Sequence, residues 1–84
     1  MIRIVIVDDH AILRRGLSQI IAENADMQVV GEAETSSEAL RLLREKPCDV
    51  VLLDVSLPDR NGVETLKLAR RELPKLRVLM LSMH

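Results

Sequence analysis

Residues 50–62 read VVLLDVSLPDRNG, an apolar run that ends at a carboxylate and is followed by a turn. Four consecutive apolar residues are too few for a helix. They predict a strand buried on both faces, as in parallel sheets covered by helices. In such sheets ligands bind beyond the carboxyl ends of the strands. We therefore expect Asp54 to end a strand and to face a ligand site. Pro58 and Gly62 then stop the strand and shape a loop before the next helix.

The composition is that of one small globular domain. Of the 84 residues, 48% are hydrophobic and 30% are charged. A chain of this length buries only about 60% of its unfolded surface, so no second domain fits. The net charge is −1 with both signs interspersed, which predicts no nucleic-acid binding by this segment. The single cysteine, Cys48, and the absence of a signal-peptide or membrane-spanning pattern favour a cytoplasmic location and no membrane partner.

Strand and helix patterns alternate along the chain. Strands are expected at residues 2–7, 27–33, 50–54 and 77–82, and helices within residues 11–24, 35–46 and 63–73. Gly31 and mixed polarity indicate that the second strand is a shorter one near a sheet edge. Thr35 and Glu38 have the spacing of a capping box at a helix start. The order β-α-β-α-β-α-β predicts an α/β fold with a parallel sheet and helices on its faces.

All three helical segments carry an apolar face at helical spacing, which in the second segment consists of Ala39, Leu40, Leu42 and Leu43. The stripes consist of Leu13, Leu17, Ile20 and Ile21 in the first segment and of Val63, Leu66, Ala69 and Leu73 in the third. We expect these side chains to pack on the sheet. Charged residues of the first helix, such as Arg14, are expected to point mostly elsewhere.

A second acidic strand end repeats the pattern of the first. Asp8 and Asp9 directly follow the apolar run at residues 2–7. If this strand lies between the second and third strands, Asp8, Asp9 and Asp54 meet at one edge of the sheet. Three crowded carboxylates repel one another, so they favour a bound cation, and Mg²⁺ prefers such oxygen ligands. A metal there would let Asp54 attack phosphorus as a nucleophile and form an aspartyl phosphate. Ser82, at the end of the fourth strand, could donate a hydrogen bond to that phosphoryl group.

The joint spacing of these residues resembles the receiver domain of a two-component response regulator, in particular the NarL/FixJ-like branch. The matching features are the pair Asp8-Asp9 followed by His10, then Asp54 with Pro58 and Gly62 four and eight residues on, and Ser82. The resemblance implies a flavodoxin-like, doubly wound fold and a signalling module that is not itself an enzyme. In the full-length protein such a module controls transcription through a DNA-binding output domain.

The resemblance also implies roles for individual residues. Asp54 would accept a phosphoryl group from a histidine kinase, and Ser82 would be the switch hydroxyl. Mg²⁺ would be surrounded by Asp8, Asp9, Asp54 and the backbone carbonyl of Ser56. His10 and His84 are interpreted as solvated, because no second histidine or cysteine stands at ligand spacing. Cys48 is interpreted as a small, partly buried apolar residue.

The sequence departs from the family pattern at its C-terminal end. A complete receiver has five β/α units, and these 84 residues reach only the fourth strand. We therefore expect residues 1–84 to be the N-terminal portion of a receiver, without the last helix, strand and helix and without the lysine of the fifth strand. The backbone of residues 78–81 would then form an unpaired edge, which predicts a homo-oligomer built around the fourth strand.

Three other functions compete with this interpretation. The chain could be a folding or oligomerisation unit that is not phosphorylated, because the lysine is missing. A haloacid-dehalogenase-like phosphohydrolase also uses a strand-end aspartate with Mg²⁺, but it has a D-x-D pattern after its first strand, whereas Asp8 and Asp9 are adjacent. A cobalamin-binding module has the pattern D-x-H-x-x-G, and Leu13 stands where its glycine would be.

Overall fold

A computed structural model describes residues 1–81 of the chain. Its elements follow the predicted alternation of strands and helices. They are β1 (Ile2–Val7), α1 (Ala11–Ala22), β2 (Met27–Ala33), α2 (Ser36–Glu45), β3 (Val50–Asp54), α3 (Gly62–Glu72) and β4 (Arg77–Leu81). The proposed switch residue Ser82 lies outside the described residues. No helix within residues 1–81 is long and apolar enough to cross a membrane.

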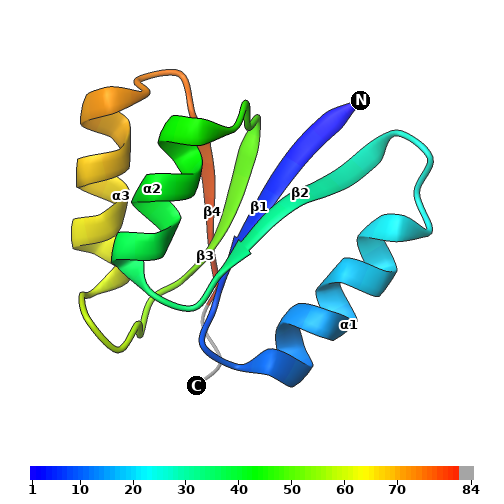
Figure 1. The fold of residues 1–84 in the computed structure, drawn as a ribbon, viewed down its shortest axis with the longest axis horizontal. Helices are drawn as coiled ribbons and strands as arrows, with labels where there is room; N and C mark the ends of the chain where they lie inside the picture. The colour runs from blue at the N-terminus through cyan, green and yellow to red at the C-terminus, as the bar shows by residue number, and fades with distance from the viewer. Residues whose placement is uncertain (82–84) are drawn as a thin grey trace.

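The four described strands form one parallel sheet in the order β2-β1-β3-β4. The helix α1 covers one face of the sheet, and α2 and α3 lie side by side on the other (Figure 1). This is the flavodoxin-like, doubly wound arrangement that the sequence predicts. The direction of strand addition reverses between β1 and β3, and such a switch point is where open α/β sheets bind ligands. The carboxyl ends of β1 and β3 therefore mark the expected site.

The sheet divides the hydrophobic interior into two unequal parts. Successive residues of a strand point to opposite faces, so β1 sends Val5 and Val7 toward α2 and α3, and Ile4 and Ile6 toward α1. On the side of α2 and α3, the buried cluster has eleven residues, against three on the α1 side. The larger cluster includes Val51 and Leu53 of the strand that ends at Asp54.

The second helix begins at the predicted cap. The Thr35 side chain accepts a 3.2 Å hydrogen bond from the backbone amide of Glu38, which satisfies one of the amides that a helix start leaves unpaired. The third helix is capped in the same way, because the Asn61 side chain accepts a 2.7 Å hydrogen bond from the amide of Val63. Both caps fix where the loops from the carboxyl edge of the sheet become helix.

The helix α1 differs from its prediction in three respects. It ends at Ala22, two residues earlier than expected. Ile20 is 60% exposed, because the helix packs on the sheet through Leu17 and Ile21 and leaves the flank of the predicted stripe in solvent. The Arg14 side chain is only 12% exposed and does not point away from the protein. Its guanidinium reaches back to the end of β1, where it donates a hydrogen bond to a backbone carbonyl.

Two further sequence expectations need correction. The strand β2 is at the sheet edge as predicted, but with seven residues it is the longest strand described. Its register against β1 shifts between Ile4 and Val5, which accommodates an extra residue. In α3, the predicted stripe residue Val63 is 46% exposed, and Thr65 is buried instead. The face of the helix that is turned to the interior thus includes Thr65, whose hydroxyl donates a hydrogen bond to Ser36 of α2.

Candidate metal centre

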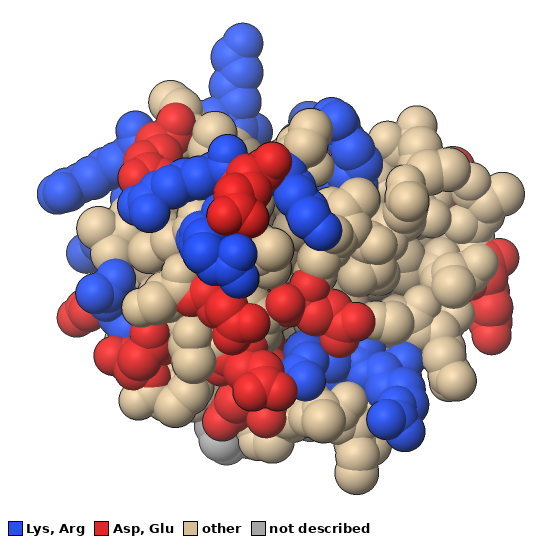
Figure 2. Space-filling view, viewed as in Figure 1, with Lys and Arg blue, Asp and Glu red and all other residues tan. Residues whose placement is uncertain are grey.

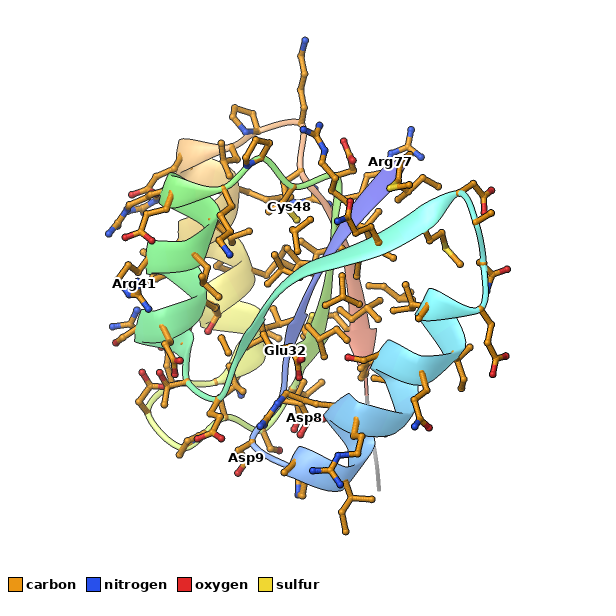
Figure 3. All side chains as sticks on the ribbon, turned by 45° about the vertical axis from the view of Figure 1, so that its right-hand side comes forward. Asp8, Asp9, Glu32, Arg41, Cys48 and Arg77 are labelled. Atoms are coloured by element: carbon orange, nitrogen blue, oxygen red, sulfur yellow. The ribbon has the colours of Figure 1, made fainter. Side chains whose placement is uncertain are left out.

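The carboxyl ends of β1 and β3 bring two acids together. Val7 pairs with Leu53 in the parallel ladder, so the next residues of the two strands, Asp8 and Asp54, lie beside each other. Asp9 follows at the start of the turn into α1. Figure 3 shows Asp8 and Asp9 at one end of the sheet, with Cys48 and Arg77 at the other end. The structure therefore brings together the three acids that the sequence predicts to meet.

Two carboxylate oxygens of this cluster are buried without a partner. Asp8 is 0% exposed and Asp54 is 3% exposed, and the Oδ2 atoms of both lack a hydrogen bond within the described residues. The other oxygen of Asp54 accepts a 3.1 Å hydrogen bond from the amide of Ser56. A buried, unpaired carboxylate oxygen is costly unless a cation or a donor reaches it. The pocket therefore suits a hard divalent cation, for which carboxylate oxygens are preferred ligands.

His10 lies within the acidic cluster. Its Nδ1 atom is 2.6 Å from Asp8 Oδ1, 3.1 Å from Asp9 Oδ1 and 3.8 Å from Asp54 Oδ2. The hydrogen bond with Asp8, and then the negative charges of Asp9 and Asp8, raise the pKa of His10 above its ordinary value of 6.5. The prediction of a merely solvated histidine is therefore incomplete. The side chain is 61% exposed, but its Nδ1 edge faces the carboxylates.

The loop after Asp54 is held in a fixed shape by backbone contacts. The amide of Gly62 donates a 2.7 Å hydrogen bond to the carbonyl of Val55, and Ser56 forms an antiparallel bridge with Asn61. A Cβ atom on Gly62 would lie 2.4 Å from the carbonyl oxygen of Asp54. Only glycine permits this close approach, which gives Gly62 a sharper role than the turn residue predicted from the sequence.

Sequence reasoning missed two residues that position the site. The guanidinium of Arg14 donates hydrogen bonds to the backbone carbonyl of Asp8 and, at 3.0 Å, to the carboxylate of Glu34. Asp59, in the loop after Asp54, accepts hydrogen bonds of 2.8 Å and 3.1 Å from the amides of Ser36 and Ser37. The bond from Ser36 is the main cause of a lowered pKa for Asp59. No local pattern could reveal either residue, because Glu34 lies 20 residues from Arg14, and Ser36 and Ser37 lie 23 and 22 residues from Asp59.

A family model described as the response regulator receiver domain matches residues 4–84. The chain belongs to this family. Among the curated relatives of this receiver chain, the transcriptional regulatory protein YhcZ of Bacillus subtilis is 41% identical over 80 residues, which are 95% of the chain and 37% of YhcZ. The response regulator GacA of Pseudomonas aeruginosa is 37% identical over 98% of the chain and 38% of GacA. The receiver chain thus spans less than two fifths of the length of these relatives.

Solved structures of response regulators share the fold of this receiver chain. A LuxR-family response regulator from Aurantimonas sp. superposes with a TM-score of 0.92 and is 39% identical, over 98% of the receiver chain and 59% of the Aurantimonas chain. The response regulator domain of Thermotoga maritima CheB gives a TM-score of 0.91 with 40% identity, over 98% and 60% of the two chains. The family and the flavodoxin-like fold predicted from the sequence are therefore confirmed, and the receiver interpretation is supported over its alternatives.

Proposed function

We propose that Asp54 is the phosphoacceptor of this receiver domain and takes its phosphoryl group from a histidine kinase. The observation that carries the proposal is the buried Oδ2 atom of Asp54, which has no hydrogen-bond partner in the described part of the chain. An unpaired carboxylate oxygen at a strand end is free to act as a nucleophile. The strand β3 and the bond from Ser56 to the other oxygen hold the carboxylate in one orientation.

In the proposed step, Asp54 Oδ2 attacks the phosphorus atom of a phosphohistidine. An O–P bond forms, the N–P bond of the donor breaks, and the donor imidazole takes up a proton. Asp8, Asp9, Asp54 and the backbone carbonyl of Ser56 would hold Mg²⁺, which would neutralise the phosphoryl oxygens. The unpaired, fully buried Oδ2 of Asp8 supports this ligand assignment.

Ser82 is proposed as the switch hydroxyl that donates to the phosphoryl group. The β3–β4 register pairs Asp54 with Leu81, and Ser82 is the next residue in the sequence. A phosphoryl group on Asp54 would add three acceptor oxygens and negative charge at this edge. A hydroxyl that moves to meet those oxygens would couple phosphorylation to a local rearrangement.

The relatives support a proposal for the role of a longer protein. We propose that residues 1–84 are the N-terminal portion of a receiver that controls a DNA-binding output domain, and that DNA contacts lie outside this segment. One relative, 39% identical over 98% of the chain, is a DNA-binding transcriptional activator of Mycobacterium tuberculosis. The proposed activity is stoichiometric phosphoryl acceptance without enzymatic turnover. The single cysteine supports the proposal of a reducing, cytoplasmic location.

We also propose that the chain self-associates along β4. This strand pairs only with β3 among the described strands, and Leu79 is 57% exposed on it. An open strand edge beside apolar surface favours pairing with a second copy. Sedimentation should show a concentration-dependent dimer, and Leu79→Lys should shift the chain toward monomer. A parent chain that stays monomeric at high concentration would contradict this proposal.

The test of phosphorylation is the intact mass of the chain after incubation with Mg²⁺ and a small-molecule phosphodonor. We expect the mass of one phosphoryl group on the parent chain and none on Asp54→Asn. Asp49→Asn is the matched control, because Asp49 directly precedes the opposite end of the same strand, and it should be labelled like the parent. A folded parent chain that gains no mass would favour the alternative of a unit that is not phosphorylated.

A further inference from the structure

The Arg14 side chain is largely buried although it carries a full positive charge. Only 12% of it is exposed, and a charged side chain is rarely buried unless its charge is paired. All three nitrogens of its guanidinium group have a partner. Nε donates a 3.3 Å hydrogen bond to Glu32, and Nη2 donates a 3.0 Å bond to Glu34. The third nitrogen, Nη1, donates to the backbone carbonyl of Asp8, which lies at the same end of the sheet as Glu32 (Figure 3).

The backbone of Asp8 is held on both sides. Its amide donates a 3.0 Å hydrogen bond to the carbonyl of Ala33, the last residue of β2. Its carbonyl accepts the hydrogen bond from Arg14, and the residue is 0% exposed. The carboxylate of an aspartate is one carbon atom away from the backbone, so a fixed backbone leaves the carboxylate little freedom. The contact with Arg14 therefore helps to fix the position of the Asp8 carboxylate.

The position of this carboxylate matters because Asp8 lies next to Asp54. The residues just before the two acids, Val7 and Leu53, are paired in the β1–β3 ladder. Reactive groups have to be held within about 0.5 Å of their productive geometry, and a displacement of about 1 Å can cost about 100-fold in rate. A residue that fixes the backbone of Asp8 thus acts on the chemistry at Asp54 without touching the reacting atoms.

We propose that Arg14 is a positioning residue for phosphoryl acceptance by Asp54, and that it acts through its hydrogen bond to the Asp8 carbonyl. The inference rests on the proposed function, in which Asp8 and Asp54 serve the same reaction. The bonds to Glu32 and Glu34 hold the guanidinium in place, because its planar group directs its donors in fixed directions. Loss of the guanidinium releases the Asp8 carbonyl, so the carboxylate is no longer held where the reaction needs it.

A positioning role and a purely structural role of Arg14 predict different results. If Arg14 only ties α1 to the sheet, its loss lowers the folded fraction, and phosphorylation falls by the same factor at every Mg²⁺ concentration. If Arg14 positions Asp8, its loss changes the dependence on Mg²⁺, because a group that orients a metal ligand contributes about 10 to 100-fold in metal affinity. A higher Mg²⁺ concentration then restores the rate.

The test is Arg14→Met, which keeps the apolar stem of the side chain and removes its donors. The initial rate of mass gain is measured with acetyl phosphate as the phosphodonor, over a range of Mg²⁺ concentrations. We expect the Mg²⁺ concentration at half-maximal rate to rise about 10 to 100-fold, while the rate at saturating Mg²⁺ changes less than about twofold. Calorimetric titration of the same chain with Mg²⁺, without phosphodonor, should show the same loss of affinity.

A second variant separates the bond to Asp8 from the bonds to the two glutamates. The double variant Glu32→Ala and Glu34→Ala removes both carboxylate partners of Arg14 and leaves its donor to the Asp8 carbonyl. This variant should shift the half-maximal Mg²⁺ concentration less than Arg14→Met does. Arg14→Lys should shift it in the same direction as Arg14→Met, because a single ammonium cannot bond all three partners. It replaces Arg14→Met if that variant does not fold.

Two control variants each remove an arginine that makes no contact with Asp8. Arg44 forms a 2.8 Å ion pair with Glu72 between α2 and α3, so Arg44→Met is the control for loss of an ion pair between two elements. Arg15 follows Arg14 on α1 and is exposed, so Arg15→Met is the control for a change on that helix. Both should leave the Mg²⁺ dependence unchanged. Urea unfolding of every variant gives the folded fraction to which the rates are normalised.

Two outcomes would overturn the inference. If the half-maximal Mg²⁺ concentration is unchanged in the Arg14 variants, this residue only stabilises the fold. If Arg14→Met and the double glutamate variant shift it equally, the tie to the glutamates is responsible, and not the bond to Asp8. A parent chain that gains no mass contradicts the proposed function instead. The calorimetric Mg²⁺ affinities of the parent and of Arg14→Met then still decide whether Arg14 positions Asp8.

Discussion

The hydroxyl groups of Thr65 and Ser36 lie 2.8 Å apart between α3 and α2, and both side chains are buried. Thr65→Val keeps the shape of the side chain but leaves the Ser36 hydroxyl without this partner, which costs about 1–3 kcal/mol. Adding Ser36→Ala removes the orphaned hydroxyl. The double variant should therefore recover part of the loss. Urea unfolding of the parent chain, the two single variants and the double variant measures the coupling between the two hydroxyl groups. Strictly additive losses of stability would contradict this coupling.

Gly62 and Gly16 should respond oppositely to alanine. A Cβ on Gly62 would meet the Asp54 carbonyl oxygen at 2.4 Å and the Val55 Cα at 2.8 Å, and relieving such backbone contacts costs about 1–3 kcal/mol. A Cβ on Gly16 would have no neighbour within 4 Å, and alanine inside a helix is better than glycine by about 0.5–1 kcal/mol. We expect Gly62→Ala to lower the free energy of unfolding and Gly16→Ala to raise it. Equal effects in a thermal melt would contradict the steric argument.

Removing one charge from the acidic pocket should stabilise the metal-free chain. Asp54 and Asp8 are buried side by side, each with an unpaired oxygen. In Asp54→Asn the like charges no longer repel, and the new amide can donate to a carboxylate. We expect a gain of about 1 kcal/mol or more in EDTA. Added Mg²⁺ should stabilise the parent chain more than the variant, because the variant has lost one carboxylate ligand. A ligand that binds the folded state more tightly raises its stability more. Urea unfolding with and without Mg²⁺ makes both comparisons, and a variant less stable than the parent in EDTA would contradict the repulsion.

The ion pair between Asp49 and Arg3 should make stability depend on acid pH. Hydrogen bonds from the Arg3 side chain and amide lower the pKa of Asp49 from 3.8 to about 2. A carboxylate with a lowered pKa stabilises the fold fully above its unfolded value and loses that contribution as pH falls through its folded value. Asp49→Asn should therefore be less stable than the parent at pH 7. The difference should shrink below a pH of about 4 and vanish only below about 2. Urea unfolding midpoints of both chains across this pH range measure the difference in stability. A difference that does not change with pH would mean that the substitution disturbs packing and not the ion pair.

The central part of the fold could be predicted because its signals are local. The apolar run before Asp54, the run before Asp8 and the cap at Thr35 each depend on a few neighbouring residues. Alternation of strands and helices then leaves few topologies, and the order with β1 between β2 and β3 brings the acids together. Hence both the sheet order and the acidic cluster were within reach of the sequence alone.

The errors arose where a side chain's environment depends on residues far along the chain. The apolar stripe of α1 includes Ile20, but the angle at which the helix meets the sheet leaves it exposed. Arg14 looks like a surface charge until Glu32 of β2 and Glu34, just after that strand, lie alongside it. Figure 2 shows many of the other charged side chains interspersed on one outer face, and nothing in the sequence separates Arg14 from them. The proximity of His10 to the buried carboxylate of Asp54 likewise arises only because β3 pairs with β1.

The loop between Asp54 and Gly62 is tied at several points along its length. Gly62 bonds back to Val55, Ser56 bridges to Asn61, and Asp59 holds the first amides of α2. Because these contacts are spread along the loop, adding or deleting a single residue would break at least one of them. The exposed turn at residues 23–26 could absorb an insertion with little disturbance. The number of residues between Asp54 and Gly62 is therefore fixed by the contacts that the loop makes.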